Sequence, residues 1–476
     1  MVRACAVAEA AGVPVVAIVV TGFVALAKSA ARAFGISQLS IAEYPGMIMT
    51  DSDESFLAKV ESHIAPAVVV GLTAARPMPA ETSEMAEPKP GAVVFSGGYD
   101  ELQNFYYQRG WTDGLPIVPP TPSRVKAFLA LVDRSPTEVI GVLPPEMREA
   151  TVLSVAINGV MAGCQPEFFP ALLAIVEAIA DPDFRIEDAG STPGWEPLVV
   201  FSGPVVEAMD LNSGSGVLRV GRRANTSIGR FVRLYMRNVA GLRIPPFVFD
   251  KASIGATFNV AAAEDDKVTA DLGWAPYRID HGFRLEDSAL TIQSVVAVSG
   301  PIYSFGDTAT GHLDLIAQRF AETIRFWCFA GLVYRHWHPL LVLSPAVAGV
   351  LAADGFTKVE IRHYLRDHML ITAEDLELSA SRAGVSRADF NLNAMVAAGD
   401  IPPEYGLSND PARLVPMCIK ADWINIIVAG DSARNQSRVY VNNHEQGPPI
   451  SRRIVVSGGR KQLPSTSNER MGGPNS

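Results

Sequence analysis

Residues 151–241 constrain the fold more than any other part of the sequence. They begin with two apolar helical runs, TVLSVAINGVMAGC and PEFFPALLAIVEAIA, which adjoin at Cys164. A strand-like run, LVVFSGP, follows, and then come the glycine- and serine-rich loop 212–229 and the arginine-bearing helical run RFVRLYMRN. Apolar helices that alternate with a short continuous apolar strand are typical of sheets covered by helices, so this stretch predicts an α/β fold.

Composition supports sizeable cores and excludes some functions. Of the 476 residues 48% are hydrophobic and 19% are charged, which suits a folded protein of two or three domains at roughly 100–200 residues each. The net charge of −10 argues against a nucleic-acid partner, which would need a basic face. Four scattered cysteines without CxxC spacing argue against a disulfide framework or a zinc site and favour a cytoplasmic location.

Residues 1–76 predict a small α/β unit with a parallel sheet. Helical runs alternate with strand-like runs at 13–20 and 39–45, and AVVVGLT at 67–73 predicts a further strand. The unit begins with a helix and lacks a strand and loop before it, so we interpret it as truncated. A signal peptide is an alternative for the first 30 residues, but Glu9 and Pro14 interrupt its apolar run.

The rest of the chain divides into a linker, a large domain and a tail. Residues 77–97 are rich in Pro, Ala, Glu and Ser and are interpreted as a linker. Residues 98–456 predict a larger mixed α/β (α+β) domain, and the polar, glycine-rich residues 457–476 predict a disordered tail. Because a membrane-spanning helix needs about 20 apolar residues, and no run is long and apolar enough, no membrane association is expected.

Cys164 is the first candidate catalytic residue. It precedes Pro166 and Glu167 at a predicted helix start, where free N–H groups and the helix dipole would lower the thiol pKa. Such a thiol could act as a nucleophile. The alternative is that Cys164 is a small buried hydrophobic residue, which is the commoner fate of cysteine.

A group of arginines follows and predicts an anion site. Arg230, Arg233 and Arg237 are spaced to share one helical face. Guanidinium groups match carboxylate or phosphate geometry, and the preceding loop would add backbone donors at a helix N-terminus. The predicted substrate-binding residues here are Arg223, Asn225, Thr226, Arg230 and Arg233. The alternative is a basic face that is solvated or faces another subunit.

Three further polar residues are candidates for the same cleft. Asn158 lies on an apolar helical run, so it either ties backbone groups or points into a pocket. Asp113 in the loop 111–121 is either a turn residue or a carboxylate of the site, and His281 with Asp280 is either an acid–base pair or a chance neighbour. Together with Cys164, Asp113 and His281 make up the predicted catalytic set. The acidic run at 264–266 is expected to be a solvated loop.

Motifs for metals and cofactors are weak in this sequence. His336 and His338 would share one face of a strand, but no acidic third ligand is spaced to join them, so no metal is predicted. No GxGxxG follows a strand, and there is no GxxxxGK[ST] loop or GxSxG elbow. No cofactor is therefore predicted.

Several blocks of the large domain resemble the C-terminal region of the UGSC (seleno)protein family. The blocks are WTDGLPIVPPT (111–121), AINGVMAGCQPE (156–167), RRANTSIGRFVRL (222–234) and WAPYRIDHGF (274–283), with looser agreement in LVLSPAVAGVLAADGF (341–356) and IIVAGDSARNQS (426–437). The N-terminal unit, through AAGVPVVAIVVTGFVALAKSAA (10–31), is also similar to the B-type selenoproteins of glycine, betaine and D-proline reductases.

The resemblance implies a thiol- or selenol-dependent oxidoreductase that acts on a small anionic substrate. In those relatives a reactive cysteine or selenocysteine loop precedes the first helix, whereas Met1 here already lies inside that helix. The chain is therefore expected to be an oligomeric subunit that works with a thiol-bearing partner, unless its start codon is misassigned. The alternatives are a non-catalytic or regulatory ligand-binding partner of a full-length paralogue, and a hydrolase or lyase that is metal-dependent or uses Asp113 or His281.

Overall fold

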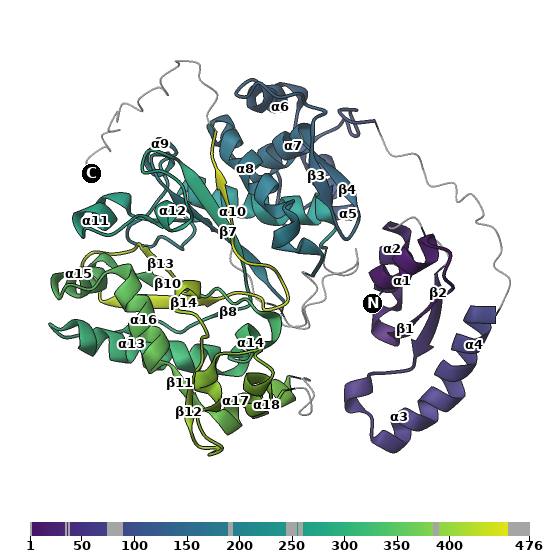
Figure 1. The fold of residues 1–476 in the computed structure, drawn as a ribbon. Helices are drawn as coiled ribbons and strands as arrows, with labels where there is room; N and C mark the ends of the chain where they lie inside the picture. Colours follow the sequence, from purple (N-terminus) through teal and green to yellow (C-terminus); the bar gives the residue numbers. More distant parts are fainter. Residues whose placement is uncertain are drawn as a thin grey trace, which may run out of the picture.

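The computed structural model describes residues 2–33, 36, 39–73, 89–188, 194–243, 255, 260–383 and 390–455. These include an N-terminal unit (residues 2–73) and a large domain (residues 98–455) (Figure 1). The predicted disordered tail and most of the predicted linker lie outside the described residues.

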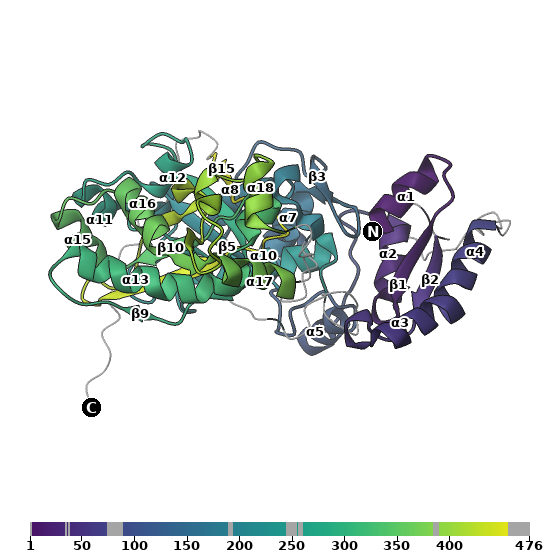
Figure 2. The same ribbon diagram turned by 60° about the horizontal axis from the view of Figure 1, so that its bottom comes forward.

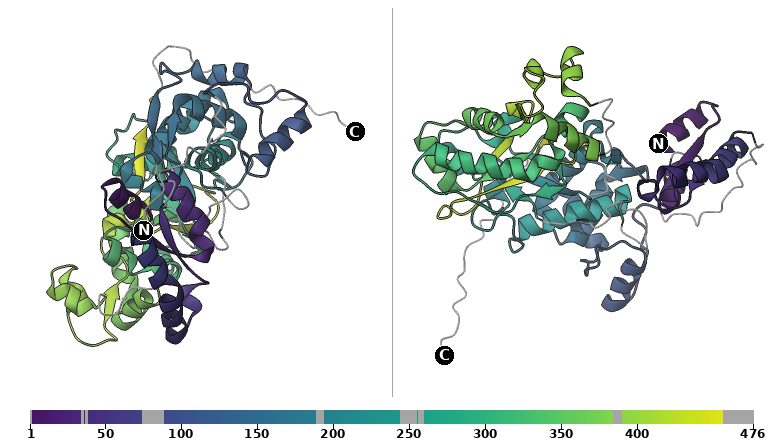
Figure 3. Two further views of the ribbon diagram at one scale, coloured as in Figure 1. Left: turned by 90° about the vertical axis from the view of Figure 1, so that its right-hand side faces the viewer. Right: turned by 90° about the horizontal axis from the view of Figure 1, so that it is seen from below.

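The N-terminal unit is built around two parallel strands. β1 (Val16–Val20) pairs with β2 (Ser40–Tyr44), with Val16 opposite Ser40. The helices α1 (Val2–Ala10) and α2 (Val24–Ala33) cover one face. The other face is covered by the helical segment that follows β2 (Figures 1 and 3). The predicted α/β arrangement with a parallel sheet is therefore confirmed here.

The further strand predicted at 67–73 is wrong, because this segment is helical. α3 (Asp53–Lys59) continues through a π-helical turn (Val60–Ile64) into α4 (Ala65–Thr73). Ala67 and Val68 pack on the sheet beside Ala42, whereas Val69 and Val70 are exposed. A short run of valines fits a strand or a packed helix equally well, and only the sheet contact decides between them.

The same helix differs from the expectation that no run of this chain is long and apolar enough to span a membrane. Among the residues that the structure describes, Asp53–Thr73 is the one helix that is long and apolar enough, by length and composition, to cross a bilayer. A single helix of this kind is weak evidence for a membrane span. Its first half carries acidic residues and Lys59, and its second half packs on β2.

The first sheet of the large domain has the strand order β15-β7-β5-β6. The strands are β5 (Glu196–Ser202), β6 (Ala262–Ala263), β7 (Ala289–Val295) and β15 (Ile450–Arg453). β7 runs antiparallel to β5, with Glu196 opposite Val295, whereas β6 runs parallel to β5. One face packs against α7 (Val152–Ala162), α8 (Phe169–Ile179) and α10 (Arg223–Tyr235).

The second sheet has the order β13-β10-β14-β8. Its strands are β10 (Leu340–Leu343), β13 (Asn425–Val428), β14 (Gln436–Val441), β8 (Ala297–Val298) and β9 (Ile302–Tyr303), which also pairs with β14. β10 is parallel to β13 and antiparallel to β14. Its outer face packs on a layer of helices that includes α13 (Ala309–Ile324), α15 (Pro345–Ala353) and α16 (Lys358–His368).

The two sheets pack face to face, which gives four layers in the order helices, sheet, sheet, helices (Figures 1 and 2). Strand alternation builds this arrangement. In β5, Val199 and Phe201 face the α7–α8–α10 layer, whereas Leu198 and Val200 face Leu340 of the second sheet. Because both faces are covered, β5 is buried along its whole length. The predicted mixed α/β fold is confirmed.

Shorter elements complete the large domain. They are α5 (Tyr99–Gln108), α6 (Pro122–Leu129), β3 (Val139–Leu143), β4 (Arg148–Thr151), α9 (Val205–Ala208), α11 (Asp266–Asp271), α12 (Tyr277–Asp280), α14 (Ala330–Tyr334), β11 (Leu370–Thr372), α17 (Ala373–Arg382), α18 (Leu392–Ala397) and β12 (Leu414–Pro416). Two of these regions contain predicted site residues. Asp113 lies in the loop between α5 and α6, and His281 directly follows α12.

Candidate functional site

Asp113 and Arg230 form a two-pronged ion pair between the loop 111–121 and α10. Arg230 Nε donates to Asp113 Oδ2 at 2.8 Å, and Nη2 donates to Oδ1 at 2.8 Å and to the carbonyl of Pro116 at 2.9 Å. Burial opposes ionisation of Asp113, but the hydrogen bonds and charge of Arg230 outweigh it and lower the pKa of the carboxyl. The pair anchors the loop to the helix, as expected of a guanidinium fork on a carboxylate.

Cys164 lies near this pair but is buried. It follows Gly163, whose φ of 83° is the left-handed conformation that ends α7 and that glycine adopts without strain. Burial raises the pKa of the Cys164 thiol to about 12, although the Ser227 hydroxyl and the charge of Arg230 act in the opposite direction. The predicted lowering of this pKa is therefore wrong, because loss of water outweighs any effect of the short helical turn at Pro166–Phe168.

Asn158 connects α7 with the end of the arginine-bearing helix. Its Nδ2 donates to the carbonyl of Ser154 at 2.9 Å, and its Oδ1 accepts from Asn238 Nδ2 at 2.8 Å. Asn238 also donates to the carbonyl of Trp111 at 3.3 Å. Of the two interpretations of Asn158, the structure shows the one in which the amide ties neighbouring groups together.

The arginines of the predicted basic face all contact groups of this chain. Arg233 forms an ion pair with the buried Glu196 at 3.1 Å, and Arg237 donates to the carbonyl of Gly110 at 3.0 Å. Arg230 is held by Asp113. A small anion at this face would therefore compete with two carboxylates that are already in place.

The N-terminus of α10 contains the other predicted anion-binding residues. The sequence predicted that Arg223, Asn225 and Thr226 lie in the loop. The helix begins at Arg223, so all three lie in its first turn instead. Asn225 is fully buried. Its Oδ1 accepts from the N–H of Asn212 at 2.8 Å, and its Nδ2 donates to the carbonyls of Asn212 at 3.1 Å and Ala261 at 2.8 Å. Thr226 Oγ1 accepts from the N–H of Gly221 at 3.1 Å. These side chains shape the loop 212–221, and Arg223 is exposed.

This loop meets the carboxyl end of β13. The N–H of Gly430 donates to the carbonyl of Ser213 at 2.8 Å, two residues beyond the last residue of the strand. Ser215 Oγ lies 3.5 Å from Asp431 Oδ2. Ligands of open α/β sheets bind at such strand ends, and helix N-termini attract anions. The N-cap residue Arg222 makes no side-chain hydrogen bond to the first turn of α10, so the N–H groups of that turn lack the usual side-chain cap.

His281 belongs to a different cluster. Its ring lies edge-on to Tyr277 at 4.5 Å, and burial lowers its pKa to about 4. Its charged neighbours are Asp280, Lys358 and Arg362, from α12 and α16. The contacts of Asp113 and Cys164 come instead from α10 and its surroundings. The structure thus divides the predicted catalytic residues between two clusters.

Sequence reasoning missed Glu264, Lys358 and Arg362. The acidic run 264–266 was expected to be solvated, which is wrong for Glu264, because its side chain is fully buried between β6 and α12. Lys358 is buried at the start of α16, and Arg362 follows one turn later on the same face. That four-residue spacing of two cations was the one signal that could have indicated the cluster.

His336 and His338 lie in the segment between α14 and β10 and not on a strand. Their rings are stacked with centroids 6.2 Å apart. Across the ranges given above for the described chain, no group of three or more His, Cys, Asp or Glu side chains is arranged to hold a metal ion.

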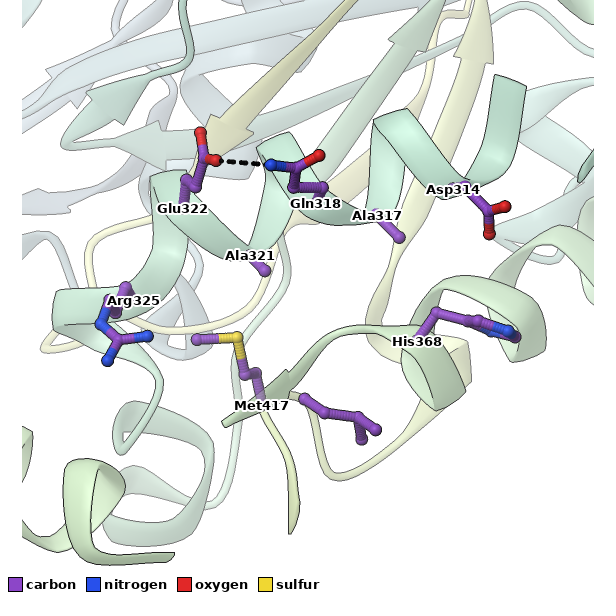
Figure 4. Close-up of a pocket in the computed structure, with 9 residues that line it drawn as sticks. Asp314, Ala317, Gln318, Ala321, Glu322, Arg325, His368 and Met417 are labelled. Atoms are coloured by element: carbon purple, nitrogen blue, oxygen red, sulfur yellow. Dashed lines mark hydrogen bonds between the residues drawn. The ribbon is translucent and has the colours of Figure 1, made fainter. Parts of the chain in front are cut away.

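A surface pocket of about 360 Å³ lies on the outer helical layer. Figure 4 shows Asp314, Gln318 and Glu322 on α13, across the pocket from His368 and Met417. Its lining includes none of the predicted site residues, so it does not join either cluster.

No protein-family model matches this sequence, and no curated protein matches it significantly.

Proposed function

We propose that this chain is the substrate-holding subunit of an oxidoreductase that acts on a small anionic molecule by thiol or selenol chemistry. The reactive sulfur or selenium comes from a thiol-bearing partner subunit. The resemblance to the UGSC family supports the class of reaction. The assignment of the reactive group to a partner rests on the burial of Cys164, which raises its thiol pKa to about 12.

The thiols of the large domain are unsuited to attack a substrate. With a pKa of about 12, the fraction of thiolate at pH 7 is on the order of 10⁻⁵. Burial also raises the pKa of Cys328 and of Cys418 to about 12. Because the thiolate is the nucleophile, a reaction of this class needs a thiol or selenol from elsewhere.

The substrate anion is held at the N-terminus of α10. Support comes from the exposed Arg223, the uncapped first turn of the helix, and the loop 212–221 at the carboxyl end of β13. The pairs Arg230–Asp113 and Arg233–Glu196 fix the neighbouring loop and strand to the helix. They position this wall of the site and do not bind the anion directly.

The proposal places the protein in the cytoplasm as part of an oligomer with its partner. All four cysteines are free, as expected in a reducing compartment. A regulatory role would use the same anion site without turnover, and a purified complex that binds the anion but does not reduce it would favour that alternative.

Binding of inorganic phosphate and of acetate, measured by isothermal titration calorimetry, tests the anion site. Arg223→Ala should weaken binding of at least one of these probes about tenfold, the loss expected for a charge-assisted contact of about 1.4 kcal/mol. Arg284→Ala is the matched control. The Arg284 side chain is highly exposed, and its ion pair with Glu286 is long at 3.8 Å. Equal affinities for the wild type and Arg223→Ala would refute this placement of the anion.

Co-purification tests the partner. The full-length chain should retain a protein whose thiol or selenol reacts with a maleimide under native conditions. A homogeneous preparation that reduces a small anionic substrate unaided would contradict the proposal.

A second candidate function is a hydrolase or lyase that uses acid–base groups. One observation favours it: burial lowers the pKa of His281 to about 4, so its ring is neutral at pH 7, and its charged neighbours are Asp280, Lys358 and Arg362. Such an enzyme would turn over its substrate without any thiol partner, so the co-purification experiment distinguishes the two.

A further inference from the structure

The large domain contains a buried cluster of charged groups that includes His281 but not Cys164. Lys358, the first residue of α16, has a side chain that is only 4% exposed. Its Nζ lies 3.2 Å from Asp280 Oδ2 and 3.6 Å from Glu264 Oε1. Arg362, one turn later, donates to the same Asp280 oxygen at 2.8 Å and to the carbonyl of Ile424 at 2.9 Å. Two cations thus converge on one carboxylate oxygen.

Glu264 is the fully buried carboxyl group of the cluster. Its side chain is fully buried, and Oε2 accepts from Ser202 Oγ at 2.8 Å and from the N–H of Tyr277 at 2.6 Å. These bonds hold the carboxylate between the end of β5 and the start of α12. Burial raises its pKa, and Lys358 acts in the opposite direction.

Two polar atoms of the cluster, Tyr277 Oη and His281 Nε2, have no hydrogen bond within the distance and angle limits among the described residues, although the Asn425 side chain is also a neighbour of the His281 ring. A third atom, Glu264 Oε1, makes no hydrogen bond within this part of the chain but lies 3.6 Å from Lys358 Nζ. Tyr277 is 1% exposed, and its ring is in edge-on contact with that of His281. Buried polar groups are almost always hydrogen-bonded, so unpartnered atoms on adjacent side chains indicate a place for a polar ligand.

Asp280 is more exposed than the two cations that it pairs with. Its side chain is 18% exposed, compared with 11% for Arg362 and 4% for Lys358. It ends α12, and the loop that follows exposes Arg284 and Glu286.

We propose that Lys358 and Arg362 bind the carboxylate of a small hydroxycarboxylic acid whose hydroxyl group bonds Tyr277 Oη and His281 Nε2. In the structure, the Asp280 carboxylate occupies the position of the ligand carboxylate. This site shares no residue with the anion site at α10. The exchange replaces one carboxylate by another, so the buried charge is unchanged, and the ligand hydroxyl provides partners for two atoms that now lack them.

The test is calorimetric titration of the full chain with glycolate and with acetate, which lacks the hydroxyl. All titrations use an Arg223→Ala background, in which the α10 site is weakened, and any residual binding at that site is the same in every variant compared. Asp280→Asn removes the competing charge and should bind glycolate at least tenfold more tightly than the parent. Asp307→Asn is the matched control, because Asp307 is an exposed aspartate that is not a member of the cluster. The parent and the control should have the same affinity.

The hydroxyl contact is tested separately. In the Asp280→Asn protein, glycolate should bind about tenfold more tightly than acetate, and Tyr277→Phe should remove most of that preference while acetate binding stays the same. Lys358→Met should abolish binding of both, and circular dichroism checks that it folds. If Lys358→Met does not fold, the Tyr277→Phe result decides. Glycolate affinity that is unchanged by Asp280→Asn, or a preference that survives Tyr277→Phe, would overturn the proposal.

Discussion

The guanidinium of Arg230 donates two hydrogen bonds of 2.8 Å to the carboxylate of Asp113, although 117 positions separate the two residues in the sequence. The side chains are only 18% and 12% exposed. Such a pair connects the loop 111–121 to α10 and makes each partner dependent on the other.

Removal of Arg230 should therefore destabilise the large domain. Arg230→Gln leaves the Asp113 carboxylate largely buried without its partner, and we expect a loss of about 2–4 kcal/mol in the free energy of unfolding. Urea denaturation monitored by fluorescence measures it. Asp113→Asn in the Arg230→Gln background should cost little more, because the uncompensated charge is gone. Additive losses in this double-mutant cycle would contradict a direct pair.

Cys164 should be unreactive in the folded protein. Since burial raises its thiol pKa to about 12, iodoacetamide at pH 8 should modify Cys164 only after unfolding in urea. Mass spectrometry of peptides from native and unfolded samples measures this. Cys5, which is only partly buried, serves as the internal comparison and should react faster. Rapid native alkylation of Cys164 would restore it as a candidate nucleophile.

Stability should fall in mild acid because buried histidines must gain a proton. Burial lowers the pKa of His281, His338 and His444 to about 4, whereas an unfolded histidine titrates near 6.5. Their neutral forms therefore stabilise the fold fully above about pH 6.5, and this contribution is lost as the pH falls towards 4. For the mostly buried His281 the loss is on the order of 3 kcal/mol.

Urea midpoints at pH 7, 5.5 and 4.5 measure this dependence. His281→Gln should flatten the fall between pH 6.5 and 4.5, whereas substitution of the exposed His63 should leave it unchanged. A variant whose pH profile matches the wild type would show that His281 titrates normally.

Asn225 should be needed for the shape of the loop 212–221. Its amide makes three hydrogen bonds in a fully buried position, so Asn225→Ala should cost about 2–3 kcal/mol at roughly 1 kcal/mol for each bond. Hydrogen exchange should become faster at Asn212, whose N–H bonds the Asn225 side chain. The exposed Asn435, substituted in the same way, is the control. Unchanged exchange at Asn212 would contradict this role.

Much of the architecture could be predicted from local patterns. Strands at β5 and β13 and helices at α7 and α8 follow from apolar runs whose length and spacing leave few alternatives. The segment 67–73 could not be assigned in this way, because its valines satisfy a strand and a helix alike until Val68 meets the sheet. Likewise, only the packing of two sheets determines that Leu198 faces one core and Val199 another.

For the candidate sites, the sequence by itself determined which chemical groups are present and which lie on one helical face, as with Arg230 and Arg233. Only the tertiary structure decided their ionisation and partners. It buried Cys164, gave Arg230 a carboxylate, and enclosed Glu264 with Lys358. The physical reason is that a pKa and an ion pair depend on solvent exposure and on neighbours that are distant along the chain, whereas secondary structure depends mainly on residues close by.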